Sequence, residues 1–385
     1  MTDVVIIGAG VQGLSAAYHL ALGGTGDVLV LESEDRAGQG SSGRSGSMLM
    51  KSRENRPKIA LSLFSYDRFM DFRDEFGEEL VFRKTGFLSA VPESQAERYG
   101  AEHDLRLAMG APSVKLTASE VTAVTPGVRT DDLAFAILGP DDGEISAEQI
   151  LAAYERRARD LGVTICFGEI AIGIESLGDR IVAVRTNKRD VPCGIVVNAA
   201  GASALEVGEW VGLRLPLSNL RRSLYFGRTA DPAFQSGPMV EDADLEWYYR
   251  PLGGRTVLVG MGREHGGPPT EGPNLEYLPE VRRAAAHRAP GLADFELTGG
   301  VSGIRSLTPD ILPIIGPVAG LDGYLNLCGW GGEGIMHSPA GGALIADWVN
   351  STSTCPVPRD LFLYERFVAA SDFSHTRVHI ERSSS

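Results

Sequence analysis

A glycine-rich turn near the start of the chain carries the first recognisable chemistry. Gly8, Gly10 and Gly13 follow the apolar run Val4-Val5-Ile6-Ile7 and precede a stretch with helical apolar spacing. In such a turn the first glycine permits a tight bend, the second lets the backbone approach a pyrophosphate, and the third allows helix-on-sheet packing. The N–H groups of the helix N-terminus then face the phosphate. Glu32, which ends the next apolar run, can accept hydrogen bonds from ribose hydroxyls and repels a 2′-phosphate. The pattern predicts a dinucleotide site that disfavours NADP.

Three further segments indicate which dinucleotide is bound, since the first turn alone does not separate NAD from FAD. Residues 40–48 form a hydroxyl-rich loop, called the serine loop below, that suits an extended diphosphate and ribityl chain. A small-residue turn follows an apolar run at 197–201. A glycine-rich turn at 329–334 precedes another predicted helix. A positive helix end would stabilise the negative charge of a reduced flavin by about 1 kcal/mol, a requirement that NAD does not have. Together the three segments favour FAD.

The elements that must position these segments follow from apolar periodicity. The strand–turn–helix–strand pattern of the first 32 residues predicts the start of a nucleotide-binding fold. A long amphipathic helix is expected at 56–76, a strand at 82–91, and a helix at 146–161 followed by closely spaced short strands. The predicted fold class is α/β, with a discontinuous Rossmann-like FAD-binding domain interleaved with a mixed-sheet α+β substrate domain.

The domain limits follow from where the nucleotide-binding pieces fall along the chain. The FAD-binding domain is expected at 1–82, 144–216 and 298–350, and the substrate domain at 83–143 and 217–297. Residues 351–385 are expected to pack on the FAD-binding domain and to end in a frayed tail. A length of 385 residues suits two to three domains of ordinary size.

The composition of the chain limits the classes of partner that the protein is expected to bind. The formal net charge of −14 disfavours nucleic acid and anionic lipid. The four cysteines lie far apart without a metal-ligand spacing, so neither a zinc site nor a disulfide framework is expected, and no metal is predicted. No apolar run is long enough to span a bilayer. We expect a cytoplasmic protein whose partners are small molecules, and the sequence leaves its oligomeric state open.

Taken in order, these segments resemble the glycine/D-amino-acid oxidase (DAO) family of FAD-dependent amine oxidoreductases, particularly its glycine oxidases and monomeric sarcosine oxidases. The resemblance runs nearly end to end and includes GIRSLTPD at 303–310 and PIIG at 313–316. It implies catalytic roles for two residues. The family's arginine that grips the substrate carboxylate falls on Arg305, and a tyrosine that faces the substrate falls on Tyr248, with Tyr249 on the opposite face. A structural salt bridge for Arg305 and a core position for Tyr248 are the alternatives.

The resemblance also implies noncovalent FAD. Arg305 and Ser306 occupy the stretch where sarcosine oxidases carry a flavin-linking cysteine, and no histidine lies near the serine loop as it does in sarcosine dehydrogenases. The predicted cofactor-binding residues, taken from the glycine turns, the strand ends and the serine loop, are Gly8, Gly10, Val11, Gln12, Gly13, Glu32, Ser33, Ser41, Ser42, Arg44, Ser45, Ser47, Met48, Ile170, Ala200, Gly201, Arg305, Gly329, Gly331, Gly332, Gly334 and Ile335.

The expected reaction is oxidation of the Cα–N bond of a glycine-type or N-substituted glycine. Hydride passes from Cα to flavin N5, and the imine hydrolyses to glyoxylate or another 2-oxo acid and an amine. Trp330 to Glu333 lacks the His or Arg that relatives carry in this turn, which favours a bulky N-substituent, such as that of a biosynthetic intermediate. An oxidase is favoured over a dehydrogenase. The strand at 257–259 nevertheless lacks the oxygen-activating lysine of the sarcosine oxidases, so the acceptor is O₂ or another molecule.

Three alternative functions stay open at this point. The first is a D-amino-acid or proline-type dehydrogenase with an acceptor other than O₂. The second is an FAD-binding subunit of a hetero-oligomeric amine dehydrogenase, and the third is an NAD-dependent dehydrogenase.

Overall fold

The computed structural model describes residues 2–262 and 272–368. Its chain divides into two compact units that interleave along the sequence. Unit 1 comprises Met1–Gly43, Ala147–Asn219 and Arg305–Ser385, and unit 2 comprises Arg44–Ser146 and Leu220–Ile304. The domain limits expected from the sequence concern which parts bind cofactor and substrate, and they stay predictions. The far end of the expected C-terminal segment lies outside the described residues.

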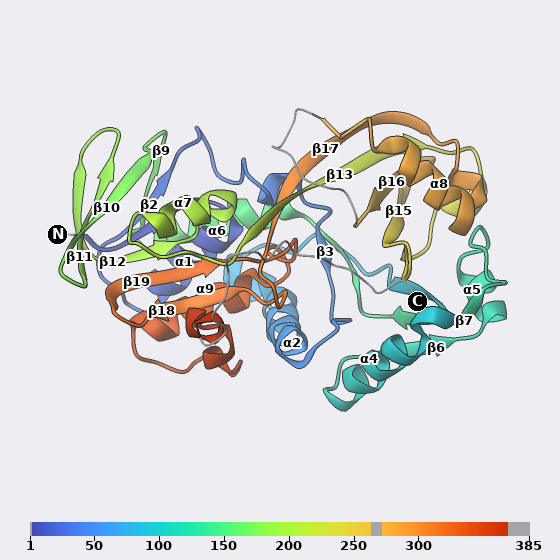
Figure 1. Ribbon diagram of the computed structural model, residues 1–385, viewed down its shortest axis with the longest axis horizontal. Coiled ribbons are helices and arrows are strands. Elements are labelled where there is room, and N and C mark those ends of the chain that lie inside the picture. The colour runs from blue at the N-terminus through green and yellow to red at the C-terminus, as the bar shows by residue number, and fades with distance from the viewer. Residues whose placement is uncertain (1, 263–271, 369–385) are drawn as a thin grey trace. The chain divides into compact units, whose positions relative to one another are not determined.

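Unit 1 is built on a sheet whose central strands run parallel (Figure 1). The strand order is β10-β11-β19-β12-β1-β2-β9, and β18 pairs with β19. The strands are β1 (Thr2–Ile7), β2 (Val28–Glu32), β9 (Thr164–Phe167), β10 (Ala171–Leu177), β11 (Arg180–Thr186), β12 (Asp190–Asn198), β18 (Ile314–Val318) and β19 (Leu321–Cys328). The first strand lies between β2 and β12, parallel to both. Their carboxyl ends therefore meet at one edge of the sheet, where ligands of open α/β sheets bind.

The helices of unit 1 pack on this sheet and on one another. They are α1 (Val11–Leu22), α6 (Ala147–Asp160), α7 (Ala204–Glu209) and α9 (Ser338–Val349), with short 3₁₀ turns η1 (Ser42–Arg44), η3 (Gly201–Ser203), η6 (Arg359–Phe362) and η7 (Tyr364–Phe367). α1 packs against both α9 and α6. Two glycines of α9 allow this close approach, because a Cβ at Gly341 would lie 2.1 Å from Gln12 Oε1 and one at Gly342 2.3 Å from Ser15 Oγ.

Unit 2 contains a mixed sheet with the order β17-β13-β16-β15-β14-β5-β7-β6 and a small antiparallel sheet β3-β8-β4. The strands are β3 (Met48–Leu49), β4 (Phe82–Arg83), β5 (Phe87–Pro92), β6 (Val114–Leu116), β7 (Leu133–Gly139), β8 (Gly143–Ile145), β13 (Ser218–Arg228), β14 (Met239–Asp242), β15 (Trp247–Gly253), β16 (Thr256–Met261) and β17 (Glu296–Leu307). The helices are α2 (Arg56–Met70), α3 (Phe72–Phe76), α4 (Ala96–Ala108), α5 (Ala118–Val124) and α8 (Leu278–Arg288), with 3₁₀ turns η2 (Glu93–Gln95), η4 (Pro232–Phe234) and η5 (Pro290–Leu292).

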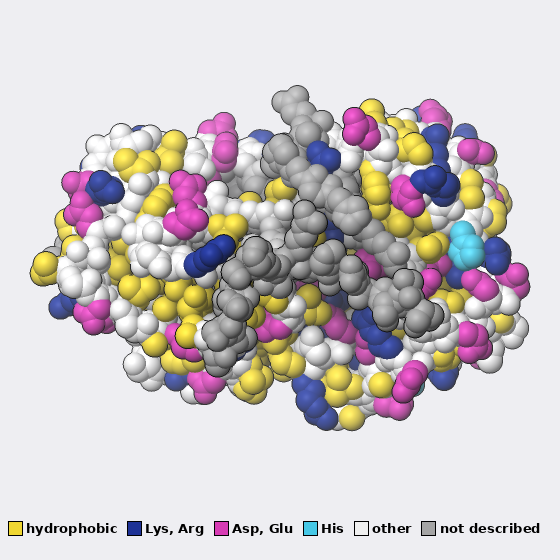
Figure 2. Space-filling model, viewed as in Figure 1, with side chains coloured by type: hydrophobic (Ala, Val, Ile, Leu, Met, Phe, Trp, Pro, Cys, Tyr) yellow, Lys and Arg dark blue, Asp and Glu magenta, His cyan; other side chains and the backbone are white. Residues whose placement is uncertain are grey.

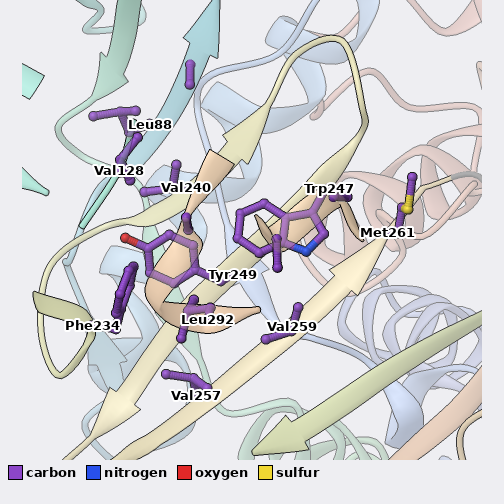
Figure 3. Packing of buried hydrophobic residues seen from close by; sticks show 14 of the residues in the cluster. Leu88, Val128, Phe234, Val240, Trp247, Tyr249, Val257, Val259, Met261 and Leu292 are labelled. Atoms are coloured by element: carbon purple, nitrogen blue, oxygen red, sulfur yellow. The ribbon is translucent and has the colours of Figure 1, made fainter. Parts of the chain in front are cut away.

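One face of the large sheet in unit 2 carries an aromatic core (Figure 3). Trp247 and Tyr249 point to this face from β15, and Val257 and Val259 join them from β16. The ring of Phe234 meets that of Tyr249 edge-on, with centroids 5.3 Å apart. Because side chains alternate along a strand, Tyr248 points to the other face. The chain therefore presents a second, separate surface around Tyr248.

The α/β class predicted from the sequence is confirmed. Two elements differ from their predicted extent. The helix expected at 56–76 is interrupted at Asp71, which separates α2 from α3. The strand expected at 82–91 is divided into β4 and β5, because the chain turns at Gly86 with a φ of 87°, a conformation that favours glycine.

Charge is distributed rather than concentrated on the face drawn in Figure 2. Acidic and basic side chains are interspersed there, and outside the grey residues this face shows no continuous basic patch. Within 2–262 and 272–368, no helix is both long and apolar enough to cross a membrane.

Candidate functional site

The turn between β1 and α1 is closed by glycines that cannot carry a side chain. Gly8 has a φ of 107°, and a Cβ there would lie 2.6 Å from the carbonyl oxygen of Ala199. A Cβ on Gly13 would lie 2.0 Å from the carbonyl oxygen of Gly8. A Cβ on Gly10, by contrast, would meet only Ser42 Oγ, at 3.4 Å. The backbone at Gly10 is thus left accessible while its two neighbours are packed tightly.

The N-terminus of α1 is available to an anion. Gly10, the N-cap residue, has no side chain to cap the helix. The N–H of Val11 donates to Ser42 Oγ at 3.1 Å, so the hydroxyl-rich loop reaches the helix tip. Gln12 donates from Nε2 to the carbonyl oxygen of Gly334 at 2.8 Å and so ties this tip to the last glycine turn. Uncapped first-turn N–H groups are typical of phosphate sites.

Glu32 lies at the carboxyl end of β2, beside the glycine turn. Its Oε2 accepts the N–H of Ala9 at 2.7 Å, and its Oε1 accepts the N–H of Glu34 at 3.0 Å and the hydroxyl of Ser33 at 3.1 Å. A carboxylate has about four acceptor positions, so one is left for a ribose hydroxyl. The residues of this edge thus fit the diphosphate and ribose of a dinucleotide.

Two other predicted segments border the same edge of the sheet. Ala200 and Gly201 continue from Ala199, which packs against Gly8, and Gly201 has a φ of 58°. Ile170 is 43% exposed and follows Glu169, whose N–H donates to the carbonyl oxygen of Glu32 at 3.0 Å. An exposed apolar side chain beside the acidic strand end is suited to packing against a purine ring.

The last glycine turn lies against Arg305. Gly331 and Gly332 have φ values of 57° and 99°, and a Cβ on Gly332 would lie 2.7 Å from Arg305 Nε. Residues Leu307 and Trp330 form an isolated bridge that joins the arginine strand to the turn. Contrary to the sequence prediction, no helix begins directly after this turn. The following helix, α9, starts only at Ser338, so backbone and not a helix tip lies beside Arg305. Gly329 and Ile335 flank the turn, and Ile335 is buried.

Arg305 has no protein counter-ion among the described residues. No carboxylate pairs with its guanidinium there, and no acceptor within 2–262 or 272–368 takes a hydrogen bond from it. The side chain is partly exposed. A guanidinium is always charged and carries five donors, so this one is available to a carboxylate from outside the protein.

The ring of Tyr248 lies against the backbone of Gly260, where there is no side chain. A Cβ on Gly260, its cross-strand partner, would lie 2.4 Å from the Tyr248 ring. Leu224 and Leu258 pack around the ring. The alternation of Tyr248 and Tyr249 is therefore as predicted, and whether Tyr248 meets substrate stays a prediction.

The serine loop contains a strained residue. Ser47 has a φ of 51°, which is uncommon for a residue other than glycine. Its N–H donates to Ser45 Oγ at 3.0 Å. Ser41 and Arg44 are exposed, whereas Met48 is buried in β3.

Sequence reasoning missed Arg250, which contacts this loop. The only available signal was its position two residues from Tyr248 on the same face of β15.

Glu241 pairs with Tyr248 across β14 and β15. Burial, and next the nearby charge of Glu246, raise the pKa of Glu241 from 4.5 to about 7. Its ionised form is therefore disfavoured in the folded protein, and the cost to stability grows between these two pH values and is complete above the higher one. We expect Glu241→Gln to raise the free energy of unfolding by about 1–3 kcal/mol near pH 8 and to change it little near pH 4.

Urea unfolding of the variant and the wild type at the two pH values measures this difference. Glu296→Gln, which alters an exposed carboxylate of unit 2, should leave stability unchanged at both. A Glu241→Gln variant that is less stable near pH 8 would refute the assigned cause.

Among the described residues, no cluster of three or more His, Cys, Asp or Glu side chains could hold a metal ion. The cysteines at 166, 193, 328 and 355 are all free thiols.

Comparison with known proteins places these features in context. Residues 3–348 match the DAO family, described as FAD dependent oxidoreductase. The 4-methylaminobutanoate oxidase (formaldehyde-forming) of Paenarthrobacter nicotinovorans is 27% identical over 359 residues, which cover 90% of this chain and 43% of that protein. The chain spans about two fifths of the length of the first curated relatives it matches.

Solved structures with the same fold cover nearly the whole chain. L-proline dehydrogenase from P. horikoshii is similar with a TM-score of 0.87 and 24% identity, covering 96% of this chain and 98% of that one. Glycine oxidase from Geobacillus kaustophilus gives a TM-score of 0.79 and 25% identity, covering 91% and 95%.

Proposed function

Since the chain belongs to the DAO family of FAD-dependent oxidoreductases, we propose that it oxidises the Cα–N bond of a glycine-type or N-substituted glycine and uses O₂ as acceptor. FAD is the cofactor of this family, and we propose that it is held noncovalently. When bound, it supplies the two-electron acceptor for the hydride of the substrate Cα–H bond.

The observation that carries this proposal is the unpaired guanidinium of Arg305. It lies over Gly332, in the same unit as the β1–α1 turn. A bidentate Arg–carboxylate pair fixes both the position and the orientation of an amino acid. The role of Arg305 is thus to bind the carboxylate and hold Cα–H in one direction, which lowers the entropic part of the barrier.

The chemistry balances without an acid or base from the protein. With FAD bound as the two-electron acceptor, the hydrogen of the Cα–H bond would leave with its electron pair, the amine N–H proton would pass to solvent, and a C=N bond would form between Cα and nitrogen. Water then hydrolyses the imine to a 2-oxo acid, glyoxylate for a glycine, and an amine. O₂ takes up the two electrons and two protons and becomes hydrogen peroxide.

Similar proteins support the substrate class. The Paenarthrobacter relative is named as an oxidase of 4-methylaminobutanoate that forms formaldehyde, and the Geobacillus structure is that of a glycine oxidase. Both names describe an amine that carries a carboxylate. The glycines at 331 and 332 leave the turn beside Arg305 without side chains, which suits a larger substituent on nitrogen.

Anaerobic mixing of the purified protein with a substrate panel tests the proposal. Glycine, N-methylglycine and bulkier N-alkylglycines should bleach the flavin absorbance, and readmitting air should restore it with formation of peroxide. Bleaching by D-amino acids or proline alone would overturn the substrate class. Bleaching that air does not reverse would overturn the role of O₂. Flavin that stays with the protein pellet after acid precipitation would overturn noncovalent binding.

A further inference from the structure

Arg250 makes three contacts that converge on the serine loop, all of them within unit 2. Its Nη1 donates to the carbonyl oxygen of Gly46 and lies 3.3 Å from Met48 Sδ. Its Nε lies 3.1 Å from Glu144 Oε2. The side chain is only 10% exposed, so these contacts are made away from bulk water.

The contacted residues are themselves joined. Glu144 lies on β8, between Met48 of β3 and Arg83 of β4, and it also forms an ion pair with Arg83. The neighbouring N–H of Ile145 donates to the carbonyl oxygen of Ser47 at 2.9 Å. Arg250 thus connects β15 to the small sheet that carries the end of the serine loop.

The strained residue of the loop lies between the two residues that Arg250 holds. Ser47 has left-handed backbone geometry, which is unfavourable for a residue other than glycine and persists only where the surroundings enforce it. Arg250 contacts Gly46 on one side of Ser47 and Met48 on the other. Its charge is also poorly compensated, since Glu144 is shared with Arg83; burial lowers the pKa of Arg250 to about 10.

We propose that Arg250 is a positioning residue that fixes the strained conformation of Ser47 and thereby orders the segment Arg44–Met48, which is predicted from the sequence to bind FAD. Arg250 lies two residues from Tyr248 on the same face of β15. It therefore also fixes the position of the serine loop relative to the strand that carries the predicted substrate tyrosine. The inference rests on the FAD binding in the proposed function, and it does not depend on which amine is oxidised.

FAD titration of the apoprotein, followed by quenching of flavin fluorescence, tests this role without any substrate. Arg250→Met keeps most of the side-chain volume but removes the donors, and it should raise the Kd for FAD by about 10–100-fold. Arg250→Lys keeps the charge but lacks the planar fork, and it should raise the Kd by a smaller factor. Arg228→Met, at an exposed arginine of unit 2, should leave it unchanged.

The circular dichroism of the bound flavin provides a second readout, because it responds to any change in how the flavin is held. We expect an altered flavin spectrum in Arg250→Met and recovery towards the wild type in Arg250→Lys. If Arg250→Met does not fold, Arg250→Lys decides the question. A Kd within twofold of the wild type and an unchanged flavin spectrum in the folded variants would overturn the proposal. If the wild type binds FAD but no amine reduces it, the proposed reaction is wrong. The FAD titration still tests the role of Arg250 in that case.

Discussion

Arg305→Met is expected to lower kcat/KM for the amino-acid substrate by about 10³-fold without loss of FAD. The guanidinium has no carboxylate or acceptor to bind among the described residues, so the substrate is its expected partner. Losing two charge-assisted hydrogen bonds at about 1.5–3 kcal/mol each accounts for a factor of this order. Steady-state kinetics and the flavin-to-protein absorbance ratio measure the two quantities.

Two controls separate substrate binding from folding. Arg305→Lys keeps the charge but makes a single contact, so its loss should be smaller than that of Arg305→Met. Arg214→Met removes an exposed arginine of unit 1 and should leave kcat/KM unchanged. An amine that lacks the carboxylate should react equally slowly with the wild type and Arg305→Met. If the variant also lost a large factor towards this amine, Arg305 would not be acting through the carboxylate.

Gly13→Ala is expected to abolish detectable FAD binding and to lower stability by about 1–3 kcal/mol. The added Cβ would lie 2.0 Å from the carbonyl oxygen of Gly8, a backbone atom that cannot move without opening the turn. Opening the turn displaces Gly10 and the α1 tip together. The FAD content of the purified variant and its thermal melting temperature measure the two effects.

Gly100→Ala is the matched control, because Gly100 is also helical and nothing lies within 4 Å of its added Cβ. Alanine should be neutral or slightly stabilising there, since it is the better helix former. A Gly13→Ala protein that retains FAD with wild-type affinity would show that the β1–α1 turn does not hold the cofactor.

The features that could be predicted from the sequence are those set by short-range sterics. The glycine turn of 8–13 requires small residues for reasons that lie within its own strand and helix, and the alternation of Tyr248 and Tyr249 follows from strand geometry. The position of Glu32 at the end of β2 was likewise readable from the apolar run before it. The family resemblance is confirmed by the match over residues 3–348.

The features that could not be predicted depend on distant residues. The bend at Gly86 is held by hydrogen bonds with Asp142 and Met239, which lie far away in sequence. The late start of α9 leaves the glycine turn beside Arg305 without a helix tip; the local signal for this start, Pro339 in the first turn of α9, was missed. Arg250 was missed because its partners, Gly46 and Glu144, lie far away in sequence. Long-range hydrogen bonds of this kind leave no periodicity in the chain.

The most direct measurement for the central claim is an anaerobic titration of the purified flavoprotein with N-methylglycine, with glyoxylate and methylamine determined afterwards. The account predicts full loss of the oxidised flavin absorbance at about one equivalent, with the two products in equal amounts. Flavin that stays oxidised with N-methylglycine, glycine and every bulkier N-alkylglycine would contradict it.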